Sequence, residues 1–342
     1  MRKTRYKMGE KAGFTIVELL TVMSIIVILI SILVPALNKV RRFALDVKQR
    51  AQLHAISTGV EAFSAENDGY PDSNGWDDDP AGVTASRPGY PYCGAMKLAE
   101  AMVGQDLRGF NPDSRFRRNG FPGVINGTPW PCDATTGECM PYPPPNTTAY
   151  CGGITGCYEE NLKKRKTYLQ LENANATQIR DIWGLANVQS YSGFEPNAFV
   201  LCDVYSRVTS SRTGKKIGMP ILYYKADTTK TVFPTSSIDF DISNCQSANS
   251  AYIYDYRDNR GLVNIPIPWD MSHCHPMACY ASGTLYTPEG GDPNPWLFYK
   301  AISNKKMPSS NPWPYRADTF ILMSAGYDGE YGTGDDIFNF GE

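Results

Sequence analysis

The stretch Gly13-Phe14-Thr15-Ile16-Val17-Glu18-Leu19-Leu20 begins an apolar run that continues to Val34. From Phe14 to Val34 there are 21 residues, and Glu18 is the only charged one among them. At a rise of about 1.5 Å per residue, a helix of this length crosses a hydrocarbon core of about 30 Å. The run therefore predicts an N-terminal membrane-spanning helix.

A plain anchor and a secretory signal peptide are the simplest interpretations of such a run. A signal peptide has an apolar core of about 7–15 residues and a small-residue cleavage site, and neither feature is found here. Neither interpretation accounts for Glu18, because a charge inside a bilayer costs at least about 2.5–3.5 kcal/mol. An intramembrane carboxylate therefore predicts a partner and a function.

A basic leader, a glycine and then Phe-Thr-x-x-Glu ahead of an apolar helix resemble the processing signal of type IV prepilins and type II secretion pseudopilins. The resemblance implies cleavage after Gly13 by a membrane prepilin peptidase that also N-methylates Phe14. It implies that Glu18 meets the amino terminus of a neighbouring subunit during assembly. In a medium of low dielectric constant, a carboxylate and an ammonium each require the other.

The family resemblance also implies partners and a location. The partners would be the prepilin peptidase/N-methyltransferase, other pilin or pseudopilin subunits, an inner-membrane assembly platform and membrane lipid. The chain would cross the inner membrane once, with its N-terminus in the cytoplasm and its body on the far side. Basic residues flank both ends of the apolar run, so the positive-inside rule alone does not decide the orientation.

Composition and charge argue against a general nucleic-acid-binding surface. The 342-residue chain is 42% hydrophobic and has a formal net charge of −2. The leader holds five basic residues against one acidic residue, a net of +4, so its removal leaves −6 on the rest. A chain of that sign does not attract phosphate backbones non-specifically, and we expect no nucleic-acid partner.

Cysteine usage indicates an oxidising compartment. All nine cysteines lie beyond the apolar run, between Cys93 and Cys279. Short loops make three disulfides candidates: Cys132 with Cys139, Cys151 with Cys157, and Cys274 with Cys279. Spacing does not determine connectivity, and an odd number leaves at least one thiol free or intermolecular.

Helical periodicity continues beyond the apolar run. Pro35 lies just after it and is expected to kink or locally open the helix, because proline lacks the backbone donor. From there to about Asn67, the spacing of Leu53, Ile56, Val60 and Phe63 defines one apolar stripe that should pack on a sheet. Asp68-Gly69-Tyr70-Pro71 then ends the helix.

The remainder divides into an irregular segment and a strand-rich segment. Residues 69–158 are dense in Pro, Gly, Asp and Cys, which predicts a disulfide-stapled insertion with one short helix at 95–103. Strand-like runs follow at 198–205, 220–225, 237–242 and 316–326, and residues 215–224 predict a hairpin return strand. The basic run at 163–166 is most simply a solvated face.

One cluster of histidine and cysteine bears on metal binding, and the absence of known motifs bears on catalysis. His273-Cys274-His275 with Cys279 crowds soft ligands together, but the paired spacing of a zinc site is absent, and a local disulfide explains it better. The sequence contains no G-x-S-x-G and no P-loop motif. With three histidines and no convergent catalytic set, we expect that the protein is not an enzyme.

The C-terminal loop at 324–337 is acidic and rich in glycine. Its spacing is not that of an EF-hand, and an acidic hairpin turn is the simpler interpretation. The pattern Ser-x-Gly-x-Asp-Gly followed by Asp-Asp-Ile resembles the calcium-binding β-loop of major pseudopilins. The resemblance implies Ca²⁺ held by Asp328, Asp335 and Asp336, with oxygens near Ser324.

The sequence as a whole predicts an α+β, pilin-like protein: a long N-terminal helix packed on a small antiparallel sheet, with a large Cys/Pro-rich insertion. We expect a subunit of a type II secretion pseudopilus or a type IV pilus. A pilin-anchored surface adhesin and an anchored metal-dependent hydrolase are alternatives. The expected segments are a cleaved leader (1–13), an assembly helix (14–37), its amphipathic continuation (38–68), the insertion (69–158) and the sheet-containing body (159–342).

Overall fold

The computed structural model describes about 70% of the chain. The described residues are 13, 15–74, 92–114, 116, 124–125, 128–129, 142, 157–191, 194, 196–210, 212–235, 252–278, 294–308 and 310–341. The chain divides into two compact units, Met1–Val47 and Lys48–Glu342. The predicted strand at 237–242 and most of the leader and the predicted insertion lie outside the described residues.

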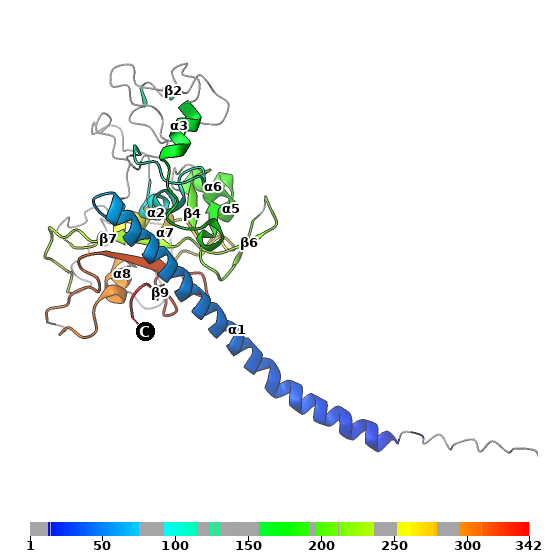
Figure 1. The fold of residues 1–342 in the computed structure, drawn as a ribbon. Helices are drawn as coiled ribbons and strands as arrows, with labels where there is room; N and C mark the ends of the chain where they lie inside the picture. The colour runs from blue at the N-terminus through cyan, green and yellow to red at the C-terminus, as the bar shows by residue number, and fades with distance from the viewer. Residues whose placement is uncertain are drawn as a thin grey trace, which may run out of the picture. The chain divides into compact units, whose positions relative to one another are not determined.

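Helices and short strands alternate along the chain (Figure 1). The helices are α1 (Ile16–Glu66), α2 (Gly94–Val103), α3 (Cys157–Lys164), α4 (Leu171–Ala174), α5 (Ile179–Trp183), α6 (Leu185–Tyr191), the 3-10 helix η4 (Tyr256–Asn259), α7 (Arg260–Val263) and α8 (Asn294–Ile302). The strands are β1 (Val124–Ile125), β2 (Thr128–Pro129), β3 (Ala176–Gln178), β4 (Phe199–Leu201), β5 (Val208–Thr209), β6 (Lys216–Ile217), β7 (Leu222–Lys225), β8 (Phe320–Ser324) and β9 (Ile337–Phe338).

The predicted long N-terminal helix is confirmed. Helix α1 has 51 residues, and it is long and apolar enough in its first part to cross a membrane. In the first unit its large apolar side chains are exposed, from Ile16 at 82% to Val47 at 51%. The helix continues without interruption through Pro35, so the proline does not open it into two helices.

The part of α1 that belongs to the second unit buries the predicted apolar stripe. Leu53, Ile56, Val60 and Phe63 are each at most 2% exposed. Burial of such side chains is worth about 1.5–3 kcal/mol each, so the stripe is a major anchor for this part of the helix.

Aromatic residues near Phe110 and Tyr168 pack on the stripe, and Met102 of helix α2 lies close to Gly59 beside it. The Phe63 ring meets the rings of Phe110 and Tyr168 edge-on, with centroids 4.9 and 5.3 Å away. A Cβ atom at Gly59 would lie 2.9 Å from the Met102 sulfur, so a glycine is needed for close helix–helix approach.

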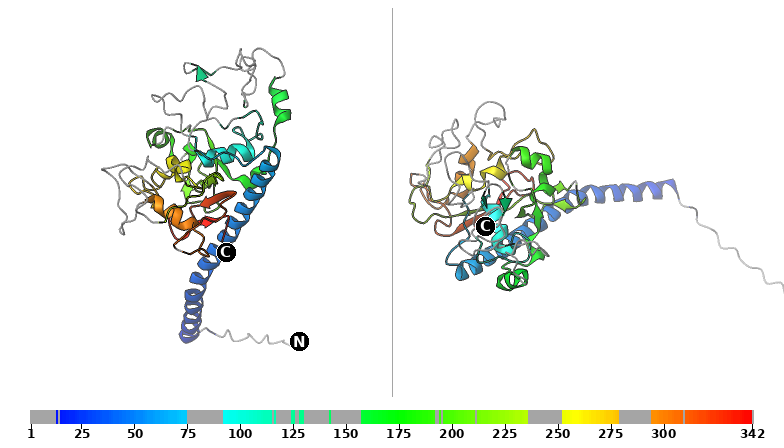
Figure 2. Two further views of the ribbon diagram at one scale, coloured as in Figure 1. Left: turned by 90° about the vertical axis from the view of Figure 1, so that its left-hand side faces the viewer. Right: turned by 90° about the horizontal axis from the view of Figure 1, so that it is seen from above.

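The sheets are small and antiparallel, as expected, but there are several of them in the described residues. Strands β7, β8 and β9 form a three-stranded sheet in that order. Leu222 pairs with Met323, which in turn pairs with Phe338. Figure 2 shows α1 (blue) running beside this sheet, where Asn339 Nδ2 donates to Ser57 Oγ at 3.5 Å.

Three two-stranded pairs complete the described strands: β1 with β2, β3 with β4, and β5 with β6. The predicted hairpin return strand at 215–224 divides into two strands. β6 closes a hairpin with β5, whereas β7 pairs with the distant β8.

Part of the predicted insertion belongs to the core of the body. All ten residues of α2 are buried, and the helix contacts β4 and β7. The boundary predicted at residue 158 therefore does not separate a surface elaboration from the core. The composition of the whole segment hid this core helix, because Pro and Gly are frequent on both sides of α2. The apolar side chains lie within Gly94–Val103 itself.

Candidate functional site

The start of α1 is a reciprocal capping arrangement. Thr15 precedes the first helical residue, and its Oγ1 accepts a hydrogen bond from Glu18 N at 3.2 Å. Glu18 Oε2 accepts from Thr15 N at 2.9 Å and from Thr15 Oγ1 at 2.7 Å. This is the Ser/Thr-x-x-Glu capping box, which satisfies two backbone donors that a helix N-terminus leaves unpaired. The motif is legible in Thr15–Glu18, but sequence reasoning assigned Glu18 only to assembly.

In the second unit, backbone N–H groups and a threonine hydroxyl donate hydrogen bonds to the carboxylates of the acidic loop. Asp335 accepts from Asp328 N at 3.0 Å and from Thr333 Oγ1 at 2.6 Å. Asp328 Oδ1 accepts from Glu330 N at 2.8 Å. The Asp335 carboxylate therefore lies against the backbone of Asp328, and the predicted role of both residues as calcium ligands stays a prediction.

Burial and proximity separate the pKa values of these two carboxyls. Burial, reinforced by the neighbouring Asp335, raises the pKa of Asp328 to about 6. Burial also acts on Asp335, but the hydrogen bonds from Thr333 and Asp328 outweigh it and lower the pKa of Asp335. Asp335 is thus the member of the pair that carries the negative charge more readily.

Asp336 is the most buried carboxyl of the loop. Its Oδ2 accepts from Gly332 N at 2.9 Å, whereas its buried Oδ1 has no hydrogen-bond partner. Burial raises the pKa of Asp336 well above its ordinary value. An unpaired buried carboxylate oxygen is costly, so this atom is a candidate contact for a cation or a proton.

The Ser324 hydroxyl contacts the acidic loop only through the backbone of Gly326, whose N–H donates to it at 3.3 Å. The same hydroxyl donates to Asp203 Oδ2 at 3.2 Å. Asp203 also accepts from Tyr205 N and Met219 N, both at 3.2 Å. This buried carboxyl joins β8 to the segments around β4 and β6, and burial raises its pKa to about 7. Sequence reasoning missed Asp203 because its partners are distant in the chain.

The segment containing His273-Cys274-His275 lies against the acidic loop. His273 Nε2 is 3.3 Å from Glu330 Oε2, and His275 Nδ1 accepts from Tyr331 N at 3.2 Å. Met277 N donates to Tyr331 O at 3.0 Å. The sequence presented the histidine cluster and the acidic loop as separate features, and folding brings them together.

This convergence does not by itself form a metal centre. Among the residues that the structure describes, no group of three or more His, Cys, Asp or Glu side chains is arranged to hold a metal ion. His275 is buried, and burial lowers its pKa to about 3, so the ring is neutral at physiological pH.

The described cysteines are thiols. Cys93, Cys202 and Cys274 are free and buried, so the expected link from Cys274 to Cys279 is not formed in the structure. Burial raises the pKa of Cys93 to about 12 and that of Cys202 further, which keeps both thiols protonated and unreactive. Cys279, Cys132, Cys139 and Cys151 lie outside the described residues, as do Phe14 and the side chain of Cys157.

The basic run at 163–166 is paired with acids. Lys164 Nζ lies 3.3 Å from Asp113 Oδ2, and Arg165 Nη1 lies 2.5 Å from Asp106 Oδ2. Lys166 is paired with Glu66 at the end of α1. Lys164 and Lys166 are exposed, as a solvated face requires, but the Arg165 side chain is fully buried, so the interpretation is wrong for that residue.

The buried carboxyl of Asp203 generates a pH-dependent prediction. Its raised pKa means that the folded state holds a proton more tightly than the unfolded state, so stability from this group is full below about pH 4 and is lost as pH rises to about 7. The shift corresponds to a free energy on the order of 4 kcal/mol. We expect Asp203→Asn to raise the melting temperature by several degrees above pH 7 and by much less near pH 4.

The measurement is thermal unfolding of the detergent-solubilised chain across that pH range. Glu159→Gln, at an exposed position on α3, controls for the loss of one carboxyl. A melting difference between wild type and Asp203→Asn that stays constant with pH would contradict the assignment.

Known proteins provide no family assignment for this chain. Comparison with protein-family models, with curated proteins and with solved structures finds no match.

Proposed function

We propose that this protein is a pilin-like structural subunit of a type II secretion pseudopilus or a type IV pilus. The observation that carries the proposal is Gly13-Phe14-Thr15-Ile16-Val17-Glu18 at the start of a 51-residue helix whose first part is apolar and exposed. Such a surface requires lipid or other apolar helices around it. Membrane lipid would cover it before assembly, and the helices of neighbouring subunits would cover it in the filament.

Processing follows from the same residues. A prepilin peptidase would cleave after Gly13 and methylate Phe14, which removes the basic leader. The protein before assembly would be a single-pass inner-membrane protein with its leader in the cytoplasm and its body exported. Its further partners would be sister subunits and an inner-membrane assembly platform. Catalysis is not part of this role.

Glu18 would have two functions in this account. The capping box to Thr15 supports the first turn of the helix in a single chain. After cleavage, the carboxylate would also compensate the new ammonium of a neighbouring subunit, because neither charge is stable alone in an apolar environment. Glu18 would thereby set the register between adjacent helices.

We also propose that the acidic loop holds Ca²⁺. The chemistry of the donors supports it: Asp335 accepts from the backbone of Asp328, and the buried Asp336 Oδ1 has no partner. The described side chains are not arranged as a ready-made metal centre, so calcium would have to draw these carboxylates together. Loop carbonyls would complete the shell, while Ser324 would contribute through its backbone because its hydroxyl bonds to Asp203. Bound calcium would neutralise the clustered carboxylates and stabilise the C-terminal end of the body.

The assembly role predicts different outcomes for two variants of the capping box. Glu18→Gln keeps an acceptor for Thr15 N and removes the charge, so we expect normal membrane insertion and at least a tenfold loss from sheared filaments. Thr15→Ala removes the hydroxyl and keeps the charge, so filament incorporation should stay within about twofold of wild type. A cap contributes about 1 kcal/mol, which a long packed helix tolerates.

Immunoblots of membrane and sheared-filament fractions measure this. If Glu18→Gln assembles normally while Thr15→Ala does not, Glu18 acts only as a capping residue, and the register role is wrong.

The calcium proposal predicts stabilisation of the wild-type chain. A ligand at 100 times its Kd stabilises the folded state by about 2.7 kcal/mol, so excess calcium should raise the melting temperature by several degrees over EDTA. Asp335→Asn should abolish most of this gain. Asp318→Asn, at an exposed position outside the loop, should keep it. An unchanged wild-type melting temperature in calcium and EDTA would rule out the site.

A further inference from the structure

A cavity of about 480 Å³ opens on the body at a place unrelated to the helix N-terminus or the acidic loop. Three segments form its walls: 72–74 after α1, 225–230 after β7, and 252–258 at η4. Its size is within the range of about 300–1,000 Å³ that is usual for small-molecule sites.

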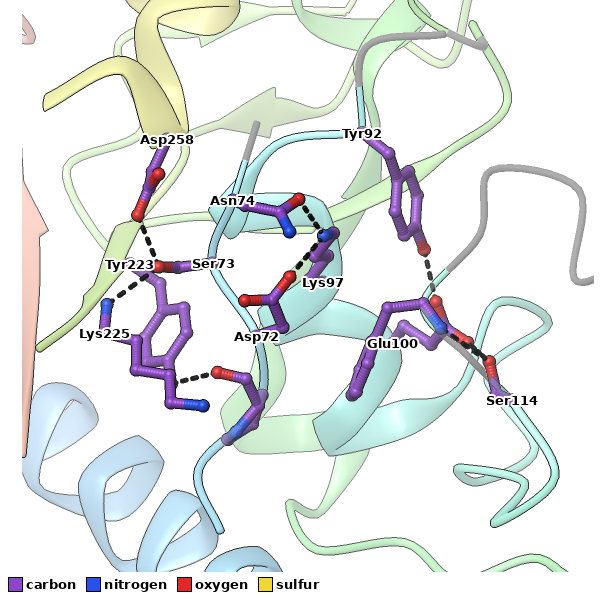
Figure 3. Close-up of polar contacts among 12 residues, drawn as sticks. Asp72, Ser73, Asn74, Tyr92, Lys97, Glu100, Ser114, Tyr223, Lys225 and Asp258 are labelled. Carbon is purple, nitrogen blue, oxygen red and sulfur yellow. Dashed lines mark hydrogen bonds and ion pairs between the residues drawn. The ribbon is translucent and has the colours of Figure 1, made fainter. Parts of the chain in front are cut away.

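Hydrogen bonds within the protein hold the walls in place. Ser73 donates to Asp258 and accepts from Lys225 N at 3.0 Å, and Figure 3 shows Ser73 between these two residues. Tyr223 OH donates to Pro71 O at 2.7 Å. Because these contacts fix the backbone on two sides, a ligand would meet a preformed site and pay little ordering entropy.

Partners within the protein already neutralise most acids of the cavity. The Lys97 side chain is fully buried, and its ammonium lies 2.8 Å from Asp72 and 2.6 Å from Asn74 Oδ1 (Figure 3). Asp255 receives the Arg257 guanidinium, with Nε 2.9 Å from both carboxylate oxygens. Ser73 donates to Asp258, and burial raises the pKa of this carboxyl well above its ordinary value, which disfavours its charged form.

The remaining charges are those of the 225–230 segment. The Asp227 carboxylate accepts from Thr229 N at 3.0 Å and from Thr229 Oγ1 at 2.6 Å. The ammoniums of Lys225 and Lys230 make neither an ion pair nor a hydrogen bond with any residue that the structure describes. Two ammoniums therefore stand beside one carboxylate in this segment of the cavity wall.

We propose that this cavity binds a small hydroxylated organic anion, whose carboxylate or phosphate group is held by Lys225 and Lys230. Lysine binds such groups as a point charge, and two of them in one wall favour an anion over a neutral molecule. The carboxylates of Asp72 and Asp255 keep acceptor positions beyond those used by their partners, and these would receive the hydroxyls of the ligand.

Calorimetric titration of the full chain in detergent at low ionic strength tests this inference. The probes are glucuronate, which carries a carboxylate, glucose 6-phosphate, which carries a phosphate, and neutral glucose. We expect saturable binding of at least one acidic sugar, at least tenfold tighter than glucose. Which acidic sugar binds tighter identifies the anionic group.

Matched variants locate the site. Lys225→Ala/Lys230→Ala should weaken binding of the acidic sugar at least tenfold, while Lys215→Ala/Lys216→Ala, in the exposed β5–β6 hairpin, should bind like wild type. Salt provides a measurement that does not depend on a variant: sodium chloride should weaken binding of the acidic sugar and leave glucose unaffected. Equal affinity for glucose, equal loss in both double variants, or no binding of either acidic sugar would overturn the inference.

Discussion

The exposure of apolar side chains along the first part of α1 is the constraint on which the rest of the account depends. Ile16, Leu19, Ile25 and Leu33 are all more than half exposed in the single chain. Exposure of apolar surface to water costs about 25 cal/mol per Å², so the exposed apolar surface of this part of the helix is unfavourable in water. A membrane or a bundle of like helices must therefore cover it, and Glu18 is the charged group that such an environment has to accommodate.

The body shows how a chain with short strands and many loops is held together. Buried polar groups join segments that are distant in sequence, as Asp203 does for β8 and Asp258 does for Ser73. Each such group is costly unless it is satisfied, so each also fixes one arrangement of the segments it joins. In the same way, Asp258 bonded to Ser73 and Asp72 paired with Lys97 line a cavity that also presents two lysines.

Periodicity made the long helix and its buried stripe predictable, because a 3.6-residue repeat is a local property of the sequence. Short strands such as β7 and β8 were also legible from their aliphatic and aromatic residues. The pairing of these strands was not predictable, because the residues around Leu222 contain no information about its distant partner Met323. The sheet edges, and the division of residues 215–224 between two strands, depend on such distant contacts.

The candidate sites divide in the same way. The capping box lies within four residues and could have been read from Thr15 and Glu18. The contact of His273 with Glu330 and the hydrogen bond of Ser324 with Asp203 join residues far apart in the chain. Motif spacing therefore could not predict them. The Cys274–Cys279 pairing failed for the converse reason: a short loop permits a disulfide, but burial of Cys274 as a free thiol depends on the surrounding core.

The mass of the N-terminal peptide from the membrane-purified protein decides whether the chain is processed as a prepilin. We expect a chain that begins at Phe14 with a methylated α-amino group. A chain that begins at Met1, or one cut within the apolar helix beyond Glu18, would contradict it.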